Sequence, residues 1–215
     1  MKADVNGKTV ELEPNSKPIL LKRLIADGFD IAVLFGLFLL LTALFMKTPL
    51  AAVYEQHFTR YREIEKETAE MYPDDAKAIS EALGKNAEYR DEHFAANLHS
   101  YLVKALACLI AEVLLFLLVP LVSRDRATAG KLLTGLLVFN ETRQTRARWY
   151  QAVYRFVFVL LIDSLGLYLF TGILTFLLVP VLRLVELLLN RKNKTLCDLI
   201  TGTMIIEKLS YDGLN

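Results

Sequence analysis

The chain has 215 residues, of which 54% are hydrophobic and 23% are charged, and its formal net charge is +1. A mean hydropathy of +0.36 is high for a soluble domain, and the balanced charge provides no field that would attract nucleic acid. The two cysteines, Cys108 and Cys197, lack CxxC spacing, so they form neither a disulfide framework nor a zinc site.

Residues 1–16 are a polar leader, in which Asn6-Gly7 favours a small hairpin. An apolar block follows at about residues 24–46, and it is long enough for one membrane-spanning helix because about 20 residues cross the hydrocarbon layer. This block contains Asp27 and Asp30 and lacks a small-residue cleavage site, so we do not interpret it as a cleaved signal peptide.

Residues 47–100 separate the first apolar block from the second, and they contain 11 acidic and 7 basic residues. Their composition is helical except near Pro73-Asp74-Asp75. We therefore expect an inserted helical hairpin outside the cytoplasm, with its turn at this point.

Two further apolar blocks follow, at about residues 101–122 and 152–190. The last block is too long for a single crossing. It suits two spans, at about 152–171 and 173–190, joined by a tight turn near Gly166 to Gly172. The alternative is a single span followed by an interfacial helix, which gives three spans in total. Residues 208–215 would be a short tail.

Basic residues flank the inner ends of these blocks and predict the orientation of the chain. Clusters precede the first span, follow the second and follow the last, and all of them would be cytoplasmic. If both termini lie in the cytoplasm, the number of spans must be even. The expected fold is therefore all-α: a polytopic bundle of four spans, with both termini in the cytoplasm. The clusters are Lys17, Lys22 and Arg23; Arg124, Arg126, Lys131, Arg143, Arg146 and Arg148; and Arg191, Lys192, Lys194 and Lys208.

Three charged residues at the start of the first span, Arg23, Asp27 and Asp30, are spaced by four and three residues. This spacing places them on one face of a helix. One interpretation is a cation or proton pathway open to the cytoplasm, and the other is an Arg–Asp pair that fixes helix packing.

The predicted spans contain more acids than bases. Ionisable residues at this depth cost about 2.5–3.5 kcal/mol each on insertion scales, so each needs a partner, water or a function. Arg183 and Glu186 can pair within one helix. The surplus of two carboxylates favours binding of protons or cations. The acids are Asp27, Asp30, Glu112, Asp163 and Glu186, and the bases are Lys104, Arg155 and Arg183.

Two segments share the pattern T-x-x-[K/D]-L-[L/I]-T-G-x-[L/M]-[V/I], at 128–138 and 195–205. Each predicts a Thr-capped short helix, a terminating glycine and a short extended run. Either the chain contains two parallel repeats related by an axis along the membrane normal, or Leu-rich interfacial segments are alike by composition. If the halves pack symmetrically, Lys131 meets Asp198; otherwise Asp198 caps a helix and Lys131 faces lipid phosphates.

These motifs resemble the RDD family, which is named for one arginine and two aspartates. The matching elements are Arg23-x6-Asp30, Thr128-x-Gly-Lys131 with Gly135, and Lys194-Thr-Leu-x-Asp198-Leu-x-x-Gly202. The resemblance covers residues 17–207, with 47–100 as an insertion, and Cys197 stands where a polar residue is usual. It implies a polytopic bacterial membrane protein, with transport suggested for the family and sodium/proton antiport claimed for some members.

We therefore expect a small transporter that exchanges cations for protons, embedded in the lipid bilayer of the bacterial inner membrane and forming a homodimer. Na⁺ and H⁺ are the expected ligands. Arg23, Lys131, Arg155, Arg183 and Asp198 are the expected structural or gating residues. The alternative is a scaffold or assembly factor that docks partners through residues 47–100. No enzyme motif occurs, and we expect no catalytic residues, metal, cofactor or nucleic acid.

Overall fold

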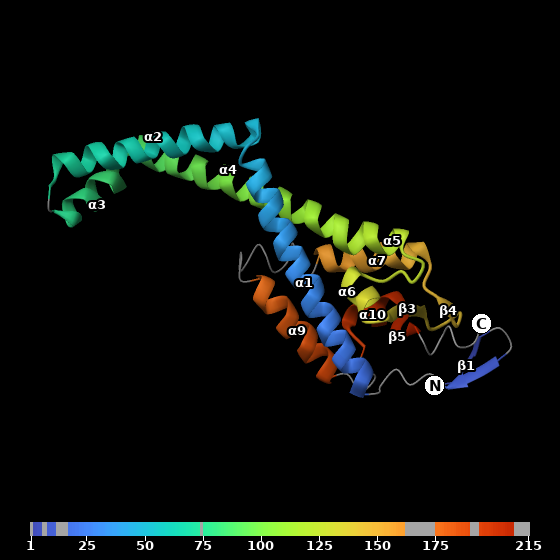
Figure 1. Cartoon of the computed structure of the whole chain (residues 1–215). Helices are drawn as coiled ribbons and strands as arrows, with labels where there is room; N and C mark the ends of the chain where they lie inside the picture. Colours follow the sequence, from blue (N-terminus) through green and yellow to red (C-terminus); the bar gives the residue numbers. More distant parts are fainter. Residues whose placement is uncertain are drawn as a thin grey trace. The chain divides into compact units, whose positions relative to one another are not determined.

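The computed structural model describes residues 2–5, 8–11, 17–73, 75–161, 175–189 and 194–208, and most of these are helical (Figure 1). The chain divides into two compact units. Unit 1 comprises Met1–Gly36 and Ala111–Asn215, and unit 2 comprises Leu37–Ile110. The predicted helical character is confirmed, apart from the strands described below.

Two helical stretches have the length and composition to cross a membrane. The first is Ile19–Phe45 within α1 (Lys17–Phe45), and the second is Ala87–Val122. In the most apolar part of each stretch, only 17% of the first and 33% of the second is buried within the chain. Apolar side chains left uncovered over this length favour a lipid environment, which indicates a membrane protein. The helices expected at the first two spans are present.

The second stretch changes its helical form along its length. It begins as α4 (Ala87–Glu112), continues as the π-helix η1 (Val113–Leu118) and ends as α5 (Val119–Val122). Pro120 lies in α5 and cannot donate a backbone hydrogen bond to the preceding turn. A widened turn before a proline accommodates this loss, and π-helical turns recur at functional sites.

The third apolar block is described in part. Helix α7 (Trp149–Phe158) begins it, and α9 (Thr175–Leu189) lies near its end. The turn predicted near Gly166 to Gly172 lies outside the described residues. Among the described residues only the two stretches above are long enough to span a membrane, so four spans remain a prediction.

Unit 2 consists of helices joined by two breaks. Helix α2 (Pro49–Met71) is followed by α3 (Ala76–Lys85), where we had expected a single turn between two long helices. Asp75 caps α3 by accepting hydrogen bonds from two backbone amides, and the Asn86 side chain accepts one from Tyr89 at the start of α4. These short polar side chains favour caps, which explains why the chain breaks twice.

Helices α2 and α4 run side by side in unit 2 (Figure 1), and polar side-chain contacts connect them. His57 Nδ1 lies 2.5 Å from Glu92 Oε2, and Arg60 pairs with Glu88 at 2.7 Å. The charge-rich composition of residues 47–100 is therefore used to pair helices with each other.

The N-terminal leader forms the hairpin that Asn6-Gly7 predicts. Strand β1 (Lys2–Val5) pairs with β2 (Lys8–Glu11) in antiparallel register, with Val5 opposite Lys8.

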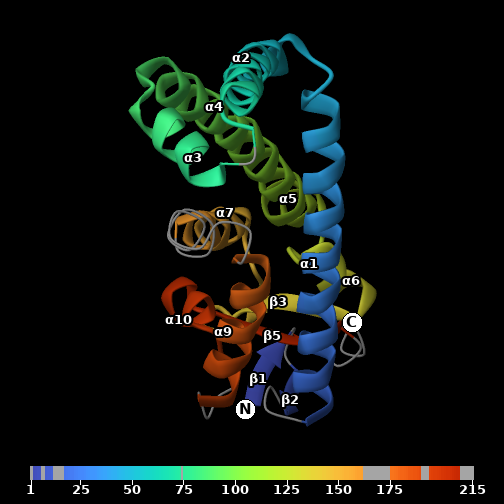
Figure 2. The same ribbon diagram turned by 90° about the vertical axis from the view of Figure 1, so that its left-hand side faces the viewer.

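Unit 1 also contains a three-stranded antiparallel sheet, so the all-α prediction is wrong here. Its order is β4-β3-β5, with β3 at Leu136–Asn140, β5 at Thr203–Glu207 and β4 at Thr145–Arg146. Figure 2 shows β3 and β5 between the short helices α6 (Ala129–Leu133) and α10 (Leu196–Thr201). The extended runs after the two motifs were expected, but their pairing was not. These two runs are mostly apolar and almost fully buried, so their side chains form part of the hydrophobic core of unit 1.

The two motif segments adopt the same local structure. Thr128 and Thr195 occupy the N-cap positions in extended conformation, and Gly135 and Gly202 follow their helices with φ of +68° and +61°. Glycine is favoured at both places because this left-handed conformation strains residues that have a Cβ.

Strands β3 and β5 pair reciprocally. Val138 lies opposite Ile205, and these two residues hold corresponding positions in the two motifs. Beyond the strand ends, Glu141 N donates to Gly202 O at 3.2 Å and Lys208 N donates to Gly135 O at 2.8 Å. Each motif segment therefore binds the other through equivalent backbone groups.

Candidate functional site

The charged residues at the start of α1 form the base of the candidate site in unit 1. Arg23, Asp27 and Asp30 have exposed fractions of 2%, 8% and 0%. Their spacing of four and three residues puts them on one face of the helix, as predicted, and that face is buried. Buried charges require partners of opposite charge. Here two residues supply them, Lys131 and Asp198, and each lies more than 100 residues away in the sequence.

The first partner is Lys131 in the short helix α6. Its Nζ atom lies 2.9 Å from Asp27 Oδ1 and 3.7 Å from Asp30 Oδ2. Asp30 also accepts hydrogen bonds from the Thr128 hydroxyl and, at 2.7 Å, from the Gly130 amide. Asp30 thus accepts from one N-terminal amide of α6 while sharing the lysine with Asp27.

Gly130 allows α6 to approach α1 closely. A Cβ atom at this position would lie 2.1 Å from the Ala26 carbonyl oxygen, which is backbone and cannot rotate away. The sequence Thr128-x-Gly-Lys131 therefore has a physical explanation. Threonine binds Asp30, glycine permits contact between the backbones, and lysine neutralises the carboxylates.

The second partner is Asp198 in α10, which binds two arginines. Arg23 Nη2 donates to its Oδ2 at 2.7 Å, and Arg155 Nη1 from α7 donates to its Oδ1 at 2.5 Å. Asp198 also forms a capping box with Thr195, since each side chain accepts a hydrogen bond from the other residue's amide. Arg155 also donates to the Thr203 hydroxyl of β5 at 2.5 Å. One carboxylate therefore joins α1, α7 and α10.

The charges around Asp198 determine its ionisation. Burial by itself would raise the pKa of Asp198, but the guanidinium groups of Arg155 and Arg23 outweigh burial and hold that pKa well below its usual range. Asp198 is therefore a fixed anion at physiological pH and does not itself carry protons.

The structure decides between the two predictions made for the motif residues. The Lys131–Asp198 contact is wrong, because Lys131 binds Asp27 and Asp30 while Asp198 binds two arginines. The alternative is correct in one half: Asp198 caps a helix, but Lys131 is buried and does not face lipid phosphates.

The remaining predicted acids are distributed differently. Glu112 is buried at the junction of α4 and η1. Glu186 of α9 accepts a hydrogen bond from the Leu196 amide at 3.2 Å. Asp163 and the side chain of Arg183 lie outside the described residues, so the Arg183–Glu186 pair remains a prediction.

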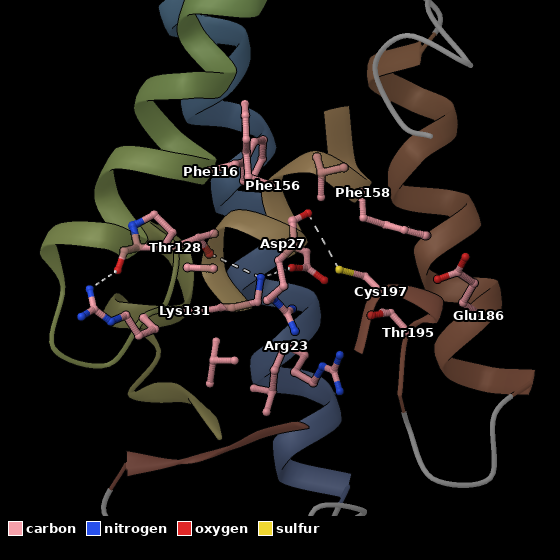
Figure 3. Close-up of a pocket in the computed structure, with 17 residues that line it drawn as sticks. Arg23, Asp27, Phe116, Thr128, Lys131, Phe156, Phe158, Glu186, Thr195 and Cys197 are labelled. Carbon is pink, nitrogen blue, oxygen red and sulfur yellow. Dashed lines mark hydrogen bonds and ion pairs between the residues drawn. The ribbon is translucent and has the colours of Figure 1, made fainter. Parts of the chain in front are cut away.

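A cavity of about 70 Å³ lies beside these groups, and Figure 3 shows Asp27, Lys131 and Arg23 at its wall. A cavity needs about 10–15 Å³ to hold one water, whereas sites for organic ligands measure about 300–1,000 Å³. This volume suits a few waters or a small ion. Phe116, Phe156 and Phe158 form its apolar side, and charged residues from α1, α6, α7 and α9 form the polar side.

Sequence reasoning missed two hydroxyl groups of this site, those of Thr128 and Thr203. Thr128 was interpreted only as a helix cap, although it binds Asp30 of α1. Thr203 follows the terminating glycine of the second motif, and its hydroxyl binds Arg155. Their positions inside the two motif segments were the only available signal for either.

Comparison with known proteins identifies one family. The profile of the RDD family matches residues 17–202. Neither the search of curated proteins nor that of solved structures gave a match. The matched range includes Arg23, Asp30 and Asp198 from the two charged clusters described above. The chain belongs to the RDD family.

Proposed function

We propose that the protein is a small membrane transporter that exchanges a monovalent cation for protons. The observation that carries this proposal is the Asp27–Asp30–Lys131 cluster, in which two buried carboxylates share one ammonium group beside a cavity of ionic size.

Counting charges supports a cation site in this cluster. Asp27, Asp30 and Lys131 together carry one more negative than positive charge, while Asp198 with its two arginines carries one more positive charge. Counting the predicted intramembrane groups together with Arg23, Lys131 and Asp198 gives six acids and five bases. The surplus in this larger set is therefore one carboxylate, smaller than the sequence count. The negative charge of the Asp27–Asp30–Lys131 cluster and the positive charge of the Asp198 cluster cancel in the sum, but each remains local to its own cluster. Two carboxylates in a low dielectric favour uptake of a proton or a metal cation.

In this mechanism, a proton and a metal cation compete for the same carboxylates. When Asp27 or Asp30 takes up a proton, the negative surplus is removed and cation affinity falls. When a cation enters, the carboxylates must be ionised and the proton leaves. Competition at one site is sufficient for coupled exchange, provided that the site opens to each side in turn.

We further propose four spans with both termini in the cytoplasm and residues 47–100 outside, in a homodimer that encloses the path. The reciprocal pairing of β3 with β5 and the left-handed glycines after both motif helices support an internal repeat of two parallel halves. The basic clusters at the inner ends of the spans support this orientation.

The test is ion flux in proteoliposomes that contain a pH-sensitive dye. Wild-type protein should move protons when a gradient of sodium or potassium is applied. Asp27→Asn should abolish this movement, because it removes one of the two charges that compete for protons and cations. Asp91→Asn is the matched control, since Asp91 is an exposed aspartate of α4. Absence of flux in the wild type for every alkali cation would refute transport.

The second candidate is a scaffold that binds a partner through unit 2, without an enzymatic activity. It is favoured by two exposed apolar residues, Phe94 and Leu98, which lie one turn apart on α4. Both precede the span predicted at residues 101–122. Site-specific cross-linking from position 94 in cells distinguishes the two functions. A single defined adduct together with a silent flux assay supports the scaffold, and flux without an adduct supports transport.

A further inference from the structure

We propose that the exposed face at the start of α7 is a docking surface for anionic phospholipids of the surrounding membrane. Trp149 lies at the level of the lipid headgroups, and Arg143 and Arg148 contact their phosphates. This inference goes beyond the proposed function, because it names a lipid partner and holds whether or not the protein moves ions.

Helix α7 has one buried and one exposed face. It packs against η1, α5 and α10 within unit 1 (Figure 1), and Ala152 and Phe156 are buried. Tyr154, Val157 and Leu161 have exposed fractions of 63%, 40% and 54%, and they are spaced by three and four residues. This spacing gives a continuous stripe along one side of a helix. The described part of the chain leaves that stripe uncovered.

The stripe changes in polarity along its length. Trp149, Tyr150 and Tyr154 begin it as a series of adjacent rings, with centroid distances of 6.1 Å and 6.3 Å. Tryptophan and tyrosine concentrate at the membrane–water interface, where the ring is in apolar surroundings and its polar end is in water. Val157 and Leu161 lie about 5 Å and 10 Å further along the helix, at about 1.5 Å per residue, where acyl chains replace headgroups.

The segment around the start of α7 supplies positive charge that acidic neighbours do not balance. Residues 142–162 contain four arginines and no acidic residue. Two of them, Arg146 and Arg155, pair with buried aspartates of unit 1. The other two, Arg143 and Arg148, are exposed, and no carboxylate among the described residues pairs with either. Exposed arginines beside interfacial aromatic rings complement the phosphates of anionic lipids in charge and in geometry.

Helices α6 and α10 provide an independent indication that lipid surrounds unit 1. Each buries its charged residue, Lys131 or Asp198, and exposes an apolar one, Leu133 at 69% or Ile200 at 64%. These pairs hold equivalent positions in the two motifs. A surface helix in water has the opposite arrangement, with its apolar stripe toward the core. The reversed arrangement in both motifs favours acyl chains, rather than water, as the neighbours of this unit.

The test uses the fluorescence of Trp149, which is the only tryptophan in the chain and therefore reports this surface alone. Full-length protein is reconstituted in phosphatidylcholine vesicles that contain a small share of brominated phosphatidylglycerol, or the same share of brominated phosphatidylcholine. Bromine quenches tryptophan at short range. The anionic lipid should quench more strongly, with a binding preference of roughly fivefold for each arginine in contact. Bromines near the glycerol end of the acyl chain should quench more than bromines near its terminal methyl group.

Arg143→Gln combined with Arg148→Gln should abolish the preference for the anionic lipid, while quenching by either lipid continues because the aromatic rings are unchanged. The matched control is Arg62→Gln combined with Arg90→Gln. It removes the same charge from two exposed arginines of unit 2, and it should leave the preference at the wild-type value.

Trp149 fluorescence that no brominated lipid quenches would place this face in water and overturn the inference. Equal quenching by the two lipids in the wild type, or a preference that survives both glutamine substitutions at 143 and 148, would overturn it as well. The measurement needs no ion flux, so it separates the two proposals. Selective quenching in a protein that moves no ions supports the lipid surface and refutes only the transporter.

Discussion

Replacing Gly130 by alanine tests the close contact between α6 and α1 on which the Asp27–Asp30–Lys131 cluster depends. The added Cβ would lie 2.1 Å from the Ala26 carbonyl oxygen. Neither group is the end of a flexible side chain, so the helices themselves must separate. Separation also lengthens the 2.7 Å hydrogen bond from the Gly130 amide to Asp30.

The magnitude follows from three contributions. Overpacking costs about 1–3 kcal/mol. Loss of a hydrogen bond to a charged group costs about 1.5–3 kcal/mol. The greater helix propensity of alanine offsets about 1 kcal/mol. The net destabilisation is then about 1.5–5 kcal/mol, and its central value of about 3 kcal/mol corresponds to a fall of roughly 6–12 °C in Tm for a chain of this size.

The assay is thermal unfolding of the detergent-solubilised protein, with Gly28→Ala as the control. Gly28 lies in α1, two residues after Ala26, and nothing lies within 4 Å of a Cβ built there. We expect that substitution to leave Tm unchanged or to raise it, by up to about 1 kcal/mol of stability. If Gly130→Ala were as stable as Gly28→Ala, the contact between the two backbones would not exist as described.

Three further outcomes follow from the caps and from Asp198. Asp198→Asn should cost about 3–5 kcal/mol, because it leaves Arg23 and Arg155 buried without their anion, and chemical denaturation measures this loss. The pKa of Asp198 is lowered on folding, so its contribution is complete above the unfolded pKa of about 4 and is lost only as pH falls further. The Tm difference between wild type and Asp198→Asn should hence be constant from about pH 5 to pH 8, and a difference that disappears by pH 6 would contradict the double-arginine contact. Gly202→Ala and Gly135→Ala should each cost about 1–2 kcal/mol, because both glycines have a positive φ that strains a residue with a Cβ. Thermal melts measure this loss. A variant as stable as wild type at either site would argue against the left-handed conformation there.

Local patterns in the sequence predicted several parts of the fold correctly. The spacing of Arg23, Asp27 and Asp30 predicted one shared helix face, and that face is buried. The dipeptide Asn6-Gly7 predicted the N-terminal hairpin. These features depend on residues a few positions apart, where backbone geometry alone determines which side chains are neighbours.

Predictions that joined distant segments succeeded less often. The glycine and the short extended run of each motif were predicted correctly. The threonine cap was correct at Thr195 but wrong at Thr128, whose side chain makes no cap hydrogen bond. The antiparallel pairing of β3 with β5 was not predicted. Internal similarity also led to a wrong pair, Lys131 with Asp198, because equivalent positions need not meet across an axis.

The sequence by itself determined the family, the apolar helices and the presence of buried charge in α1. Only the tertiary structure decided that Lys131 neutralises Asp27 and Asp30 while Arg23 and Arg155 hold Asp198. Helix periodicity is a property of neighbouring residues. The partner of a buried charge, in contrast, depends on how segments more than 100 residues apart pack, and here that packing depends on the missing side chain of Gly130.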